Sequence, residues 1–385
     1  MLIKSFKINS KLKFILPISF TLLLIFTISF SFWQLSSANN DENGEAEESY
    51  IKWFEFNVTY SVLEKTSALD INSHVNNEEI KYNWIELISY LACKYGNDFS
   101  KFKQKDLDEL IGKLESGQTM EELTQNMKYY PYYFEGYDSV LHEFIGSYQI
   151  EKKTEENTTK NSTNNVDTTE SNVNNELENN MADENNEEVT ETIEFEETYG
   201  IKAFHPLAKN YGYSHYDDFG ASRSYGYQRL HFGHDLMGSI GTPVIAIESG
   251  IVEAVGWNQY GGWRIGIRSF DQKRYYYYAH LRKDHPYAEG LEEGDIVQAG
   301  DVIGYLGMTG YSVKENVNNI NVPHLHFGIQ LIFNEVQKEG PNQIWVNLYD
   351  LTDFLKNHRS EVYKSNEVTK DYSRKYQIMD PIVSE

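Results

Sequence analysis

Short apolar runs separated by glycine turns fill the chain from Tyr199 onward, and this pattern limits the possible folds more than any other feature. The runs are too short for stable helices and are rich in Val, Ile and Tyr. They lie at 242–250, 251–256, 264–270, 274–281, 295–300, 302–307 and 323–333. Many short strands with glycine turns predict a mainly antiparallel β domain, sandwich or barrel-like, over residues 199–355.

Two turns in this region give more specific expectations. A tight turn at Ser249-Gly250 is expected to join the first two strands, and a turn at 271–273 should make a hairpin of the strands around it. After about Leu351 the chain first looks helical. Residues 356–385 are then expected to form a polar and loose C-terminal tail.

Residues 50–150 carry apolar side chains at helix spacing instead. The repeats are Trp84, Leu87, Ile88 and Leu91, then Leu107, Leu110, Ile111 and Leu114. Thr119 and Glu122 form a capping-box pattern that starts a further helix, and another is expected after Pro131. The single cysteine, Cys93, excludes an intrachain disulfide and falls inside the helical pattern. Because no residues here have catalytic or metal-ligand spacing, we predict a small all-α domain that is a spacer or binds a protein partner. An unrecognised second enzyme domain is the alternative.

Between these regions, residues 151–197 are dominated by Asn, Thr and Glu and show no apolar periodicity. Such a segment cannot bury enough surface to offset its ordering entropy, which predicts a disordered linker. Much of the formal net charge of −24 lies here, so the acidity gives no information about a substrate. The acidic excess also argues against nucleic-acid binding, which needs clustered Lys and Arg.

Residues 14–33 form an apolar run without charged side chains, and a basic segment at 1–13 precedes it. The run is long enough to cross the ~30 Å hydrocarbon core of a bilayer. Because positive flanks stay in the cytoplasm, we predict a single-pass membrane anchor with the rest of the chain outside. A cleaved signal peptide, with Ser36 and Ala38 at the cleavage site, is the alternative and would make the protein secreted. An exported chain without disulfides fits a bacterial surface.

Four histidines and one aspartate recur at or beside the expected strands. They are His231, Asp235, His280, His324 and His326. Residues two apart face the same side of a strand, so His324 and His326 should point together, and His280 should share a face with Tyr276 and Tyr278. Two histidines and one carboxylate can hold Zn²⁺ and leave a position for water, while two further histidines can move protons. Metal-assisted amide hydrolysis requires this division of roles.

The chain resembles the lysostaphin/LytM-type zinc metallopeptidases over about residues 219–333. The likeness rests on His-x-x-x-Asp at 231–235, Gly-Thr-Pro-Val at 241–244, Gly-Asp-x-Val at 294–297, Gly-Asp-x-Ile-Gly at 300–304, Gly-x-Thr-Gly at 307–310 and His-Leu-His-Phe at 324–327. The resemblance implies that His231, Asp235 and His326 bind Zn²⁺ and that His280 and His324 are catalytic. It also implies that the substrate is the peptide portion of peptidoglycan.

Two further roles follow from the resemblance. Arg223 ends a Gly-x-x-Arg stretch similar to one found before the first ligand, and we expect it to bind substrate. Tyr225 lies where some family members carry a tyrosine that supports the tetrahedral intermediate, although Tyr227 competes for this role.

The chain departs from the family at two places. His234 occupies a usually apolar position, and we expect its side chain to point away from Asp235 toward a supporting role or the surface. Residues 313–321 are an extra stretch, expected to form a loop at the rim of the groove.

Two other functions compete with peptidoglycan hydrolysis. One is a catalytically silent, peptidase-like scaffold in the cell envelope, against which the retention of all five residues argues. The other is a lipoyl- or biotinyl-carrier module, but the turn at Ser249-Gly250 offers no lysine for modification.

Overall fold

The computed structural model describes residues 50–152, 194–224, 228–338 and 342–384. The predicted anchor at 14–33 lies outside these residues, and so does most of the predicted linker. Within the described ranges, none of the helices has both the length and the apolar character that a membrane crossing needs.

The first part of the described chain is helical, as predicted. Its elements are α2 (Tyr60–Val75), α3 (Trp84–Tyr95), η1 (Phe99–Lys101), α4 (Gln104–Glu115), α5 (Met120–Thr124), α6 (Tyr130–Leu141) and η2 (His142–Phe144). Asn83 caps α3 by accepting hydrogen bonds from two backbone N–H groups, and Thr119 with Glu122 forms the expected capping box at α5. Cys93 on α3 is partly buried, and desolvation raises the pKa of its thiol to about 11.

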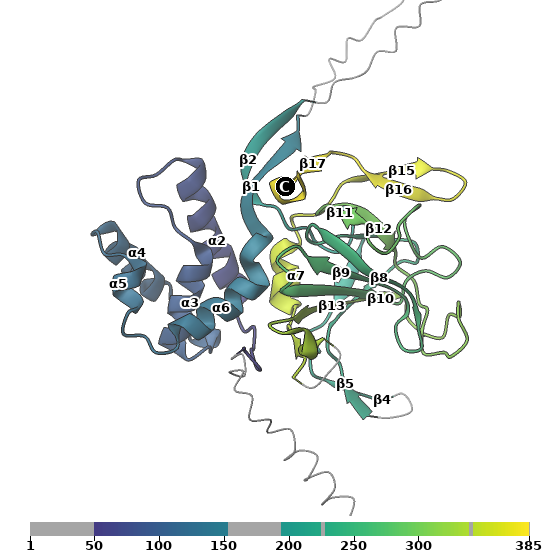
Figure 1. The fold of residues 1–385 in the computed structure, drawn as a ribbon, viewed down its shortest axis with the longest axis horizontal. Coiled ribbons are helices and arrows are strands. Elements are labelled where there is room, and N and C mark those ends of the chain that lie inside the picture. The colour runs from purple at the N-terminus through teal and green to yellow at the C-terminus, as the bar shows by residue number, and fades with distance from the viewer. Residues whose placement is uncertain (1–49, 153–193, 225–227, 339–341, 385) are drawn as a thin grey trace, which may run out of the picture. The chain divides into compact units, whose positions relative to one another are not determined.

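The helices lead directly into a strand that the sequence pattern did not predict. β1 (Ile145–Glu151) pairs antiparallel with β2 (Phe195–Ile201), and the short β17 (Ile378–Met379) lies on the other side of β1. Glu151 is the register partner of Phe195, and the Lys152 N–H donates to the Glu194 carbonyl at 2.9 Å. β1 and β2, the described strands on either side of the stretch predicted as a linker, are therefore neighbours (Figure 1).

The β region contains an antiparallel sheet of eight strands. They are β3 (Tyr213–His215), β6 (His234–Gly238), β8 (Gly250–Asn258), β9 (Gly262–Ser269), β10 (Arg274–Ala279), β11 (Ile296–Val297), β13 (His324–Leu331) and β14 (Ile344–Trp345). The order is β11-β8-β9-β10-β13-β6-β3, with β14 paired to β13. This confirms a mainly antiparallel β domain and the hairpin around 271–273.

The strand pair expected around Ser249-Gly250 is wrong. β7 (Pro243–Ile245) pairs with β12 (Val302–Tyr305) in a separate two-stranded sheet, and β8 pairs with β9 and β11 instead. Every residue from 242 to 250 is buried, whereas a strand with one solvated face would alternate. A strand covered on both faces gives no periodicity from which a partner could be read. A third short pair, β4 (Ser222–Ser224) with β5 (Gln228–Leu230), leads to the first predicted ligand.

The C-terminal segment is ordered, which corrects the expectation of a loose tail at 356–385. After η3 (Glu335–Gln337) and α7 (Tyr349–Leu355), the chain forms the β15 (Val362–Asn366) and β16 (Asp371–Arg374) pair, then β17 and α8 (Pro381–Ser384). Arg374 is buried and donates to the carbonyls of Ala299 and Ile378 at 3.1 and 3.0 Å. The polar composition of this segment led to the wrong prediction, because its charged side chains have partners inside the fold.

Residues 51–385 form one compact unit, so the helical and β regions share a core. Trp84 of α3 stacks on Phe354 of α7 with ring centroids 5.7 Å apart. Lys202 forms ion pairs with Glu143, which follows α6, and with Asp380 near the C-terminus. The helices are therefore packed on the β region.

Arg274 at the start of β10 joins the two regions and is fully buried. Its guanidinium donates to both carboxylate oxygens of Glu248 at 2.8 and 2.9 Å, and to the Ser139 carbonyl of α6 at 3.0 Å. We expect Arg274→Met to lower the free energy of unfolding by about 3–5 kcal/mol, because the Glu248 carboxylate would stay buried without its cationic partner and keep only the Tyr276 hydroxyl as a donor. Urea denaturation measures this loss. An Arg274→Met/Glu248→Leu double variant should recover part of it, and a single variant within 1 kcal/mol of wild type would contradict the assignment.

Candidate metal centre and active site

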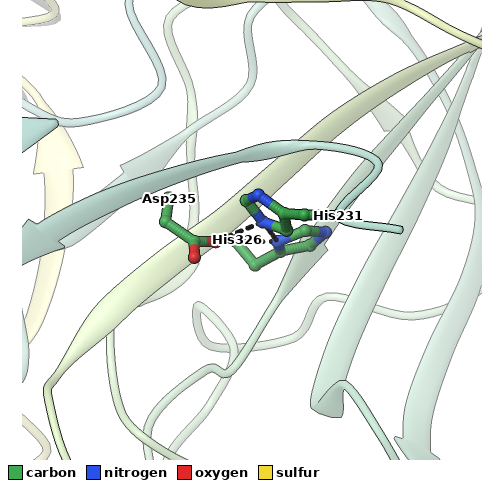
Figure 2. A group of neighbouring side chains, drawn as sticks. All are labelled: His231, Asp235 and His326. Carbon is green, nitrogen blue, oxygen red and sulfur yellow. Dashed lines mark hydrogen bonds and ion pairs between the residues drawn. The ribbon is translucent and has the colours of Figure 1, made fainter. Parts of the chain in front are cut away.

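Three of the predicted site residues converge from separate elements. His231 directly follows β5, Asp235 lies in β6 and His326 lies in β13, where it is the register partner of Asp235. The Asp235 Oδ1 atom is 2.8 Å from His326 Nδ1 and 3.1 Å from His231 Nε2, and the two nitrogens are 3.2 Å apart (Figure 2). The ligand atoms of the three residues lie within 4.8 Å of one another.

The turn between His231 and Asp235 depends on glycine. Gly233 has a φ of +147°, and a Cβ at this position would lie 2.5 Å from the His326 ring. Only a residue without a side chain lets the backbone pass so close to the imidazole. The glycine therefore allows His231 and Asp235 to approach the same point as His326.

Arg223 and Asp218 surround this group on the side of the β4–β5 pair. Asp218 Oδ1 is 3.2 Å from His231 Nδ1, and Arg223 makes ion pairs with Asp218 and with Asp235 Oδ2, the latter at 3.4 Å. A carboxylate on the far nitrogen of a histidine orients the ring and leaves the other nitrogen directed at a metal. Asp218 was not predicted, since an isolated aspartate in a polar loop carries no motif.

The electrostatics keep Asp235 ionised. Burial alone would raise the pKa of its carboxyl, but hydrogen bonds from His231 and His326 outweigh burial and hold it far below the usual range. Burial likewise acts to lower the pKa of His231, and the hydrogen bond and charge of Asp235 raise it overall. Two imidazole nitrogens and an ionised carboxylate within reach of one point form a donor set that suits Zn²⁺.

His280 and His324 lie beside this group, each held through one ring nitrogen. His280 Nδ1 is 2.9 Å from the Thr309 carbonyl and His324 Nδ1 is 2.8 Å from the Val322 carbonyl. Since a carbonyl only accepts, both Nδ1 atoms carry hydrogen and both Nε2 atoms are left as proton acceptors. Burial lowers the pKa of both rings, which keeps them neutral. Their centroids are 4.8 Å apart, and His324 Nε2 is 3.7 Å from Asp235 Oδ1.

The predicted face of His280 is wrong, although its position at the site is not. Tyr276 and Tyr278 are fully buried in the core, while Tyr277 lines the site cavity together with His280. β10 ends at Ala279, and His280 has a φ of +61°, so the strand alternation stops one residue before it. This left-handed backbone turns the ring out of the Tyr276 face and into the cavity.

These side chains open into one cavity of about 380 Å³. Its lining includes all five predicted histidine and aspartate positions, and also Arg223, Arg229, Tyr260, Tyr277, Tyr311 and Trp345. The cavity therefore offers a metal-binding group, two neutral imidazoles and aromatic walls in one place.

Comparison with known proteins agrees with this geometry. Residues 229–339 match Peptidase family M23. The chain is 41% identical over 130 residues to the L-Ala--D-Glu endopeptidase of Bacillus subtilis (strain 168), and 41% identical over 99 residues to lysostaphin of Staphylococcus simulans. Residues 229–339 are thus an M23-type peptidase region within the chain. It spans 38% of the length of the first relative and 17% of the second, and the matches cover 34% and 26% of this chain.

One solved structure is also similar to this chain in sequence. The catalytic domain of lysostaphin from Staphylococcus simulans is 37% identical, and the match covers 31% of this chain and 80% of that chain with a TM-score of 0.26. The M23 family is zinc-dependent, and His231, Asp235 and His326 form the matching candidate metal site.

The other residues singled out in the sequence have different outcomes. Tyr225 and Tyr227 lie outside the described residues. Arg223 lines the cavity, but its guanidinium forms ion pairs with Asp218 and Asp235. His234 points away from the metal group as expected, yet it is buried and not on the surface, with its Nε2 2.8 Å from His215 Nδ1.

His205, which precedes the region matched to the M23 family, is fully buried and predicts acid sensitivity. Its Nδ1 accepts the Leu207 N–H at 3.1 Å, and burial together with the charge of Arg359 lowers its pKa from 6.5 to about 3. The unfolded chain therefore takes up the proton first as pH falls. The stability that neutral His205 contributes is complete above about pH 6.5 and is lost toward pH 3.

We expect His205→Asn, which keeps an acceptor near Leu207 but cannot be protonated, to remove this dependence. Between pH 6 and 4 its free energy of unfolding should fall less steeply than that of wild type, by about 1.4 kcal/mol per pH unit. Denaturant titrations in the presence of a chelator exclude any contribution from metal release. Equal slopes for the two proteins would show that His205 does not control the acid limb.

Proposed function

We propose that this protein is a zinc-dependent endopeptidase that hydrolyses amide bonds in the peptide part of peptidoglycan. The observation that carries the proposal is the convergence of His231, Asp235 and His326 within 4.8 Å, next to two histidines whose Nε2 atoms are free to accept protons. A further relative, 30% identical over 113 residues, is named Peptidoglycan DD-endopeptidase ShyC of Vibrio cholerae, which supports this class of substrate. The bond between an alanine and a glutamate is one candidate, from the name of the Bacillus subtilis relative.

The chemistry divides between the metal and the protein. Bound zinc would supply a water of lowered pKa and a Lewis acid for the scissile carbonyl. One of the two neutral imidazoles, His280 or His324, accepts the proton of the attacking water at its Nε2 atom. This proton passes through the second imidazole to the leaving amine as the carbon–nitrogen bond breaks, so that one water is consumed and one acid and one amine are formed.

The cellular location is part of the proposal. The apolar run at 14–33 and its basic flank support a membrane anchor with the M23 domain outside the membrane, where peptidoglycan lies. A cleaved leader would deliver the same domain in secreted form. A protein partner for the helical region remains a prediction.

A catalytically silent scaffold is the alternative function. Such a protein would lack one or more of the five residues, whereas here all five line one cavity. Zinc content together with turnover separates the two possibilities.

Digestion of purified peptidoglycan, followed by mass spectrometry of the fragments, tests the proposed function. The protein should include the helices, because Trp84, Glu143 and Ser139 contact the β region and a fragment starting at 199 would lose these contacts. New amine and carboxyl ends are expected with wild type and not with His280→Ala. A zinc-loaded protein that releases no fragments would reject the peptidase proposal and favour the scaffold.

A further inference from the structure

Two arginines that line the cavity face each other across the β4–β5 pair. Arg223 and Arg229 are register partners, so their side chains lie on the same face, and both line the cavity. Like charges at directly opposite positions destabilise a strand pair. Each guanidinium charge therefore needs either an anionic partner that offsets the repulsion or a functional role.

Arg223 has its compensation in the carboxylates of Asp218 and Asp235. Arg229 differs, because none of its contacts among the described residues is a carboxylate. Its guanidinium lies 5.0 Å from the ring centre of Tyr311 and 5.8 Å from that of Tyr260, and it donates to the Tyr311 hydroxyl. Its Nε atom is buried and lacks a hydrogen-bond acceptor within the same described residues. Aromatic faces hold the cation in place but do not neutralise it.

The extra stretch at 313–321 helps to position the aromatic rings that contact Arg229. Asn319 donates to the Tyr311 carbonyl at 2.7 Å, and the Tyr311 N–H donates to the Tyr260 carbonyl at 3.2 Å. Asn316 in the same stretch accepts from the Trp263 indole at 2.9 Å, which ties the loop to β9. The loop thus positions the ring on which Arg229 rests.

Arg229 also lies close to the chemistry. It is two residues before His231, so along the extended chain both point to the same side and both line the cavity. A guanidinium with a rigid fork of donors is well suited to bind a carboxylate through two hydrogen bonds. A substrate carboxylate would supply the acceptor that the buried Nε lacks.

Resting on the proposed peptidase function, we propose that Arg229 binds a free carboxylate of the substrate beside the scissile amide, namely the carboxylate of the stem-peptide glutamate. The enzyme then selects acidic stem peptides over stem peptides in which this group is a carboxamide, and over neutral glycine bridges. Arg229 is in this sense a specificity residue and takes no part in proton transfer.

The test uses two muropeptide preparations that differ only in a free carboxylate or a carboxamide on the stem glutamate. The zinc-loaded full chain cleaves both in one mixture, and mass spectrometry gives the ratio of the kcat/KM values. Wild type should prefer the carboxylate by roughly 10- to 100-fold, the range of one charge-assisted contact. Arg229→Gln should reduce this ratio to near one, and Arg229→Lys should keep part of it. The control Lys283→Gln removes a positive charge from an exposed position outside the cavity lining and should keep the full ratio.

The outcomes separate the inference from the function on which it rests. Cleavage of both preparations with an Arg229→Gln ratio equal to that of wild type overturns the role of Arg229 and leaves the peptidase intact. No cleavage of either preparation by zinc-loaded wild type overturns the peptidase proposal. In that case calorimetric binding of the two preparations to wild type and to Arg229→Gln still decides the carboxylate preference. Unchanged zinc content and melting temperature of Arg229→Gln show that the variant is folded.

Discussion

We expect His280→Ala and His324→Ala each to lower kcat/KM for peptidoglycan peptides by about 10²- to 10⁴-fold, while zinc stays bound. The loss is the usual contribution of a positioned general acid or base. The ring of His280 is buried and that of His324 is partly buried, and both are neutral; each presents its Nε2 atom because a backbone carbonyl holds its Nδ1 hydrogen. Neither ring belongs to the three residues whose ligand atoms converge.

Cleavage rates and zinc analysis on the same preparations check this expectation. His142→Ala serves as the control, because His142 is half-exposed in η2 and pairs only with Asp138 and Glu143 among the described residues. Near-normal cleavage by His280→Ala or His324→Ala would remove that residue from the mechanism. Loss of zinc from His324→Ala would mean that ligand and catalyst are exchanged within the His-x-His pair.

Asp235→Ala and His326→Ala should lose most of the zinc, and with it nearly all hydrolysis. Wild type should hold about one Zn²⁺ per chain, since three ligands converge on one point and leave a position open. Asp235 is the central member, with its Oδ1 atom 2.8 Å from His326 and 3.1 Å from His231. Removing it leaves two histidines without the carboxylate between them.

A variant that weakens zinc binding without removing a ligand gives a second test of the metal site. Asp218→Asn keeps all three ligands and removes only the charge that orients His231, so we expect it to bind zinc about 10- to 100-fold more weakly and still to reach full occupancy at excess metal. Zinc titration against a competing chelator measures both effects. Full occupancy of Asp235→Ala at low free zinc would refute the ligand assignment.

Strand alternation predicted the parts of the site that lie on regular structure. His324 and His326 are two apart on β13 and both line the cavity, with Leu325 buried behind them. The helices of 50–150 were likewise readable from apolar spacing and from the Thr119 capping box. These features depend on neighbours in sequence, so a pattern can show them.

The rest depends on contacts between distant parts of the chain. The positive φ of His280 at the end of β10 turns its side chain away from the face that strand alternation predicts. The residues before Gly250 are all buried, so their pattern does not reveal that β7 pairs with β12. Asp218 and Arg229 have no motif. The importance of Asp218 is visible only from its contact with His231, and that of Arg229 only once β5 brings it to the cavity. The ordered C-terminal strands were missed because their polar residues find partners far away in sequence.

The pairing of β1 with β2 determines how freely the length and sequence of the acidic stretch between them can vary. Its two ends are held by a seven-residue strand pair, so doubling the length between them would cost only about 0.6 kcal/mol of closure entropy. A chain cut between 152 and 194 should therefore remain a single particle in gel filtration and separate into two polypeptides only in denaturant. Insertions there would alter neither the reach of the catalytic cavity nor its alignment with the helices, which leaves this stretch free to diverge in length and sequence.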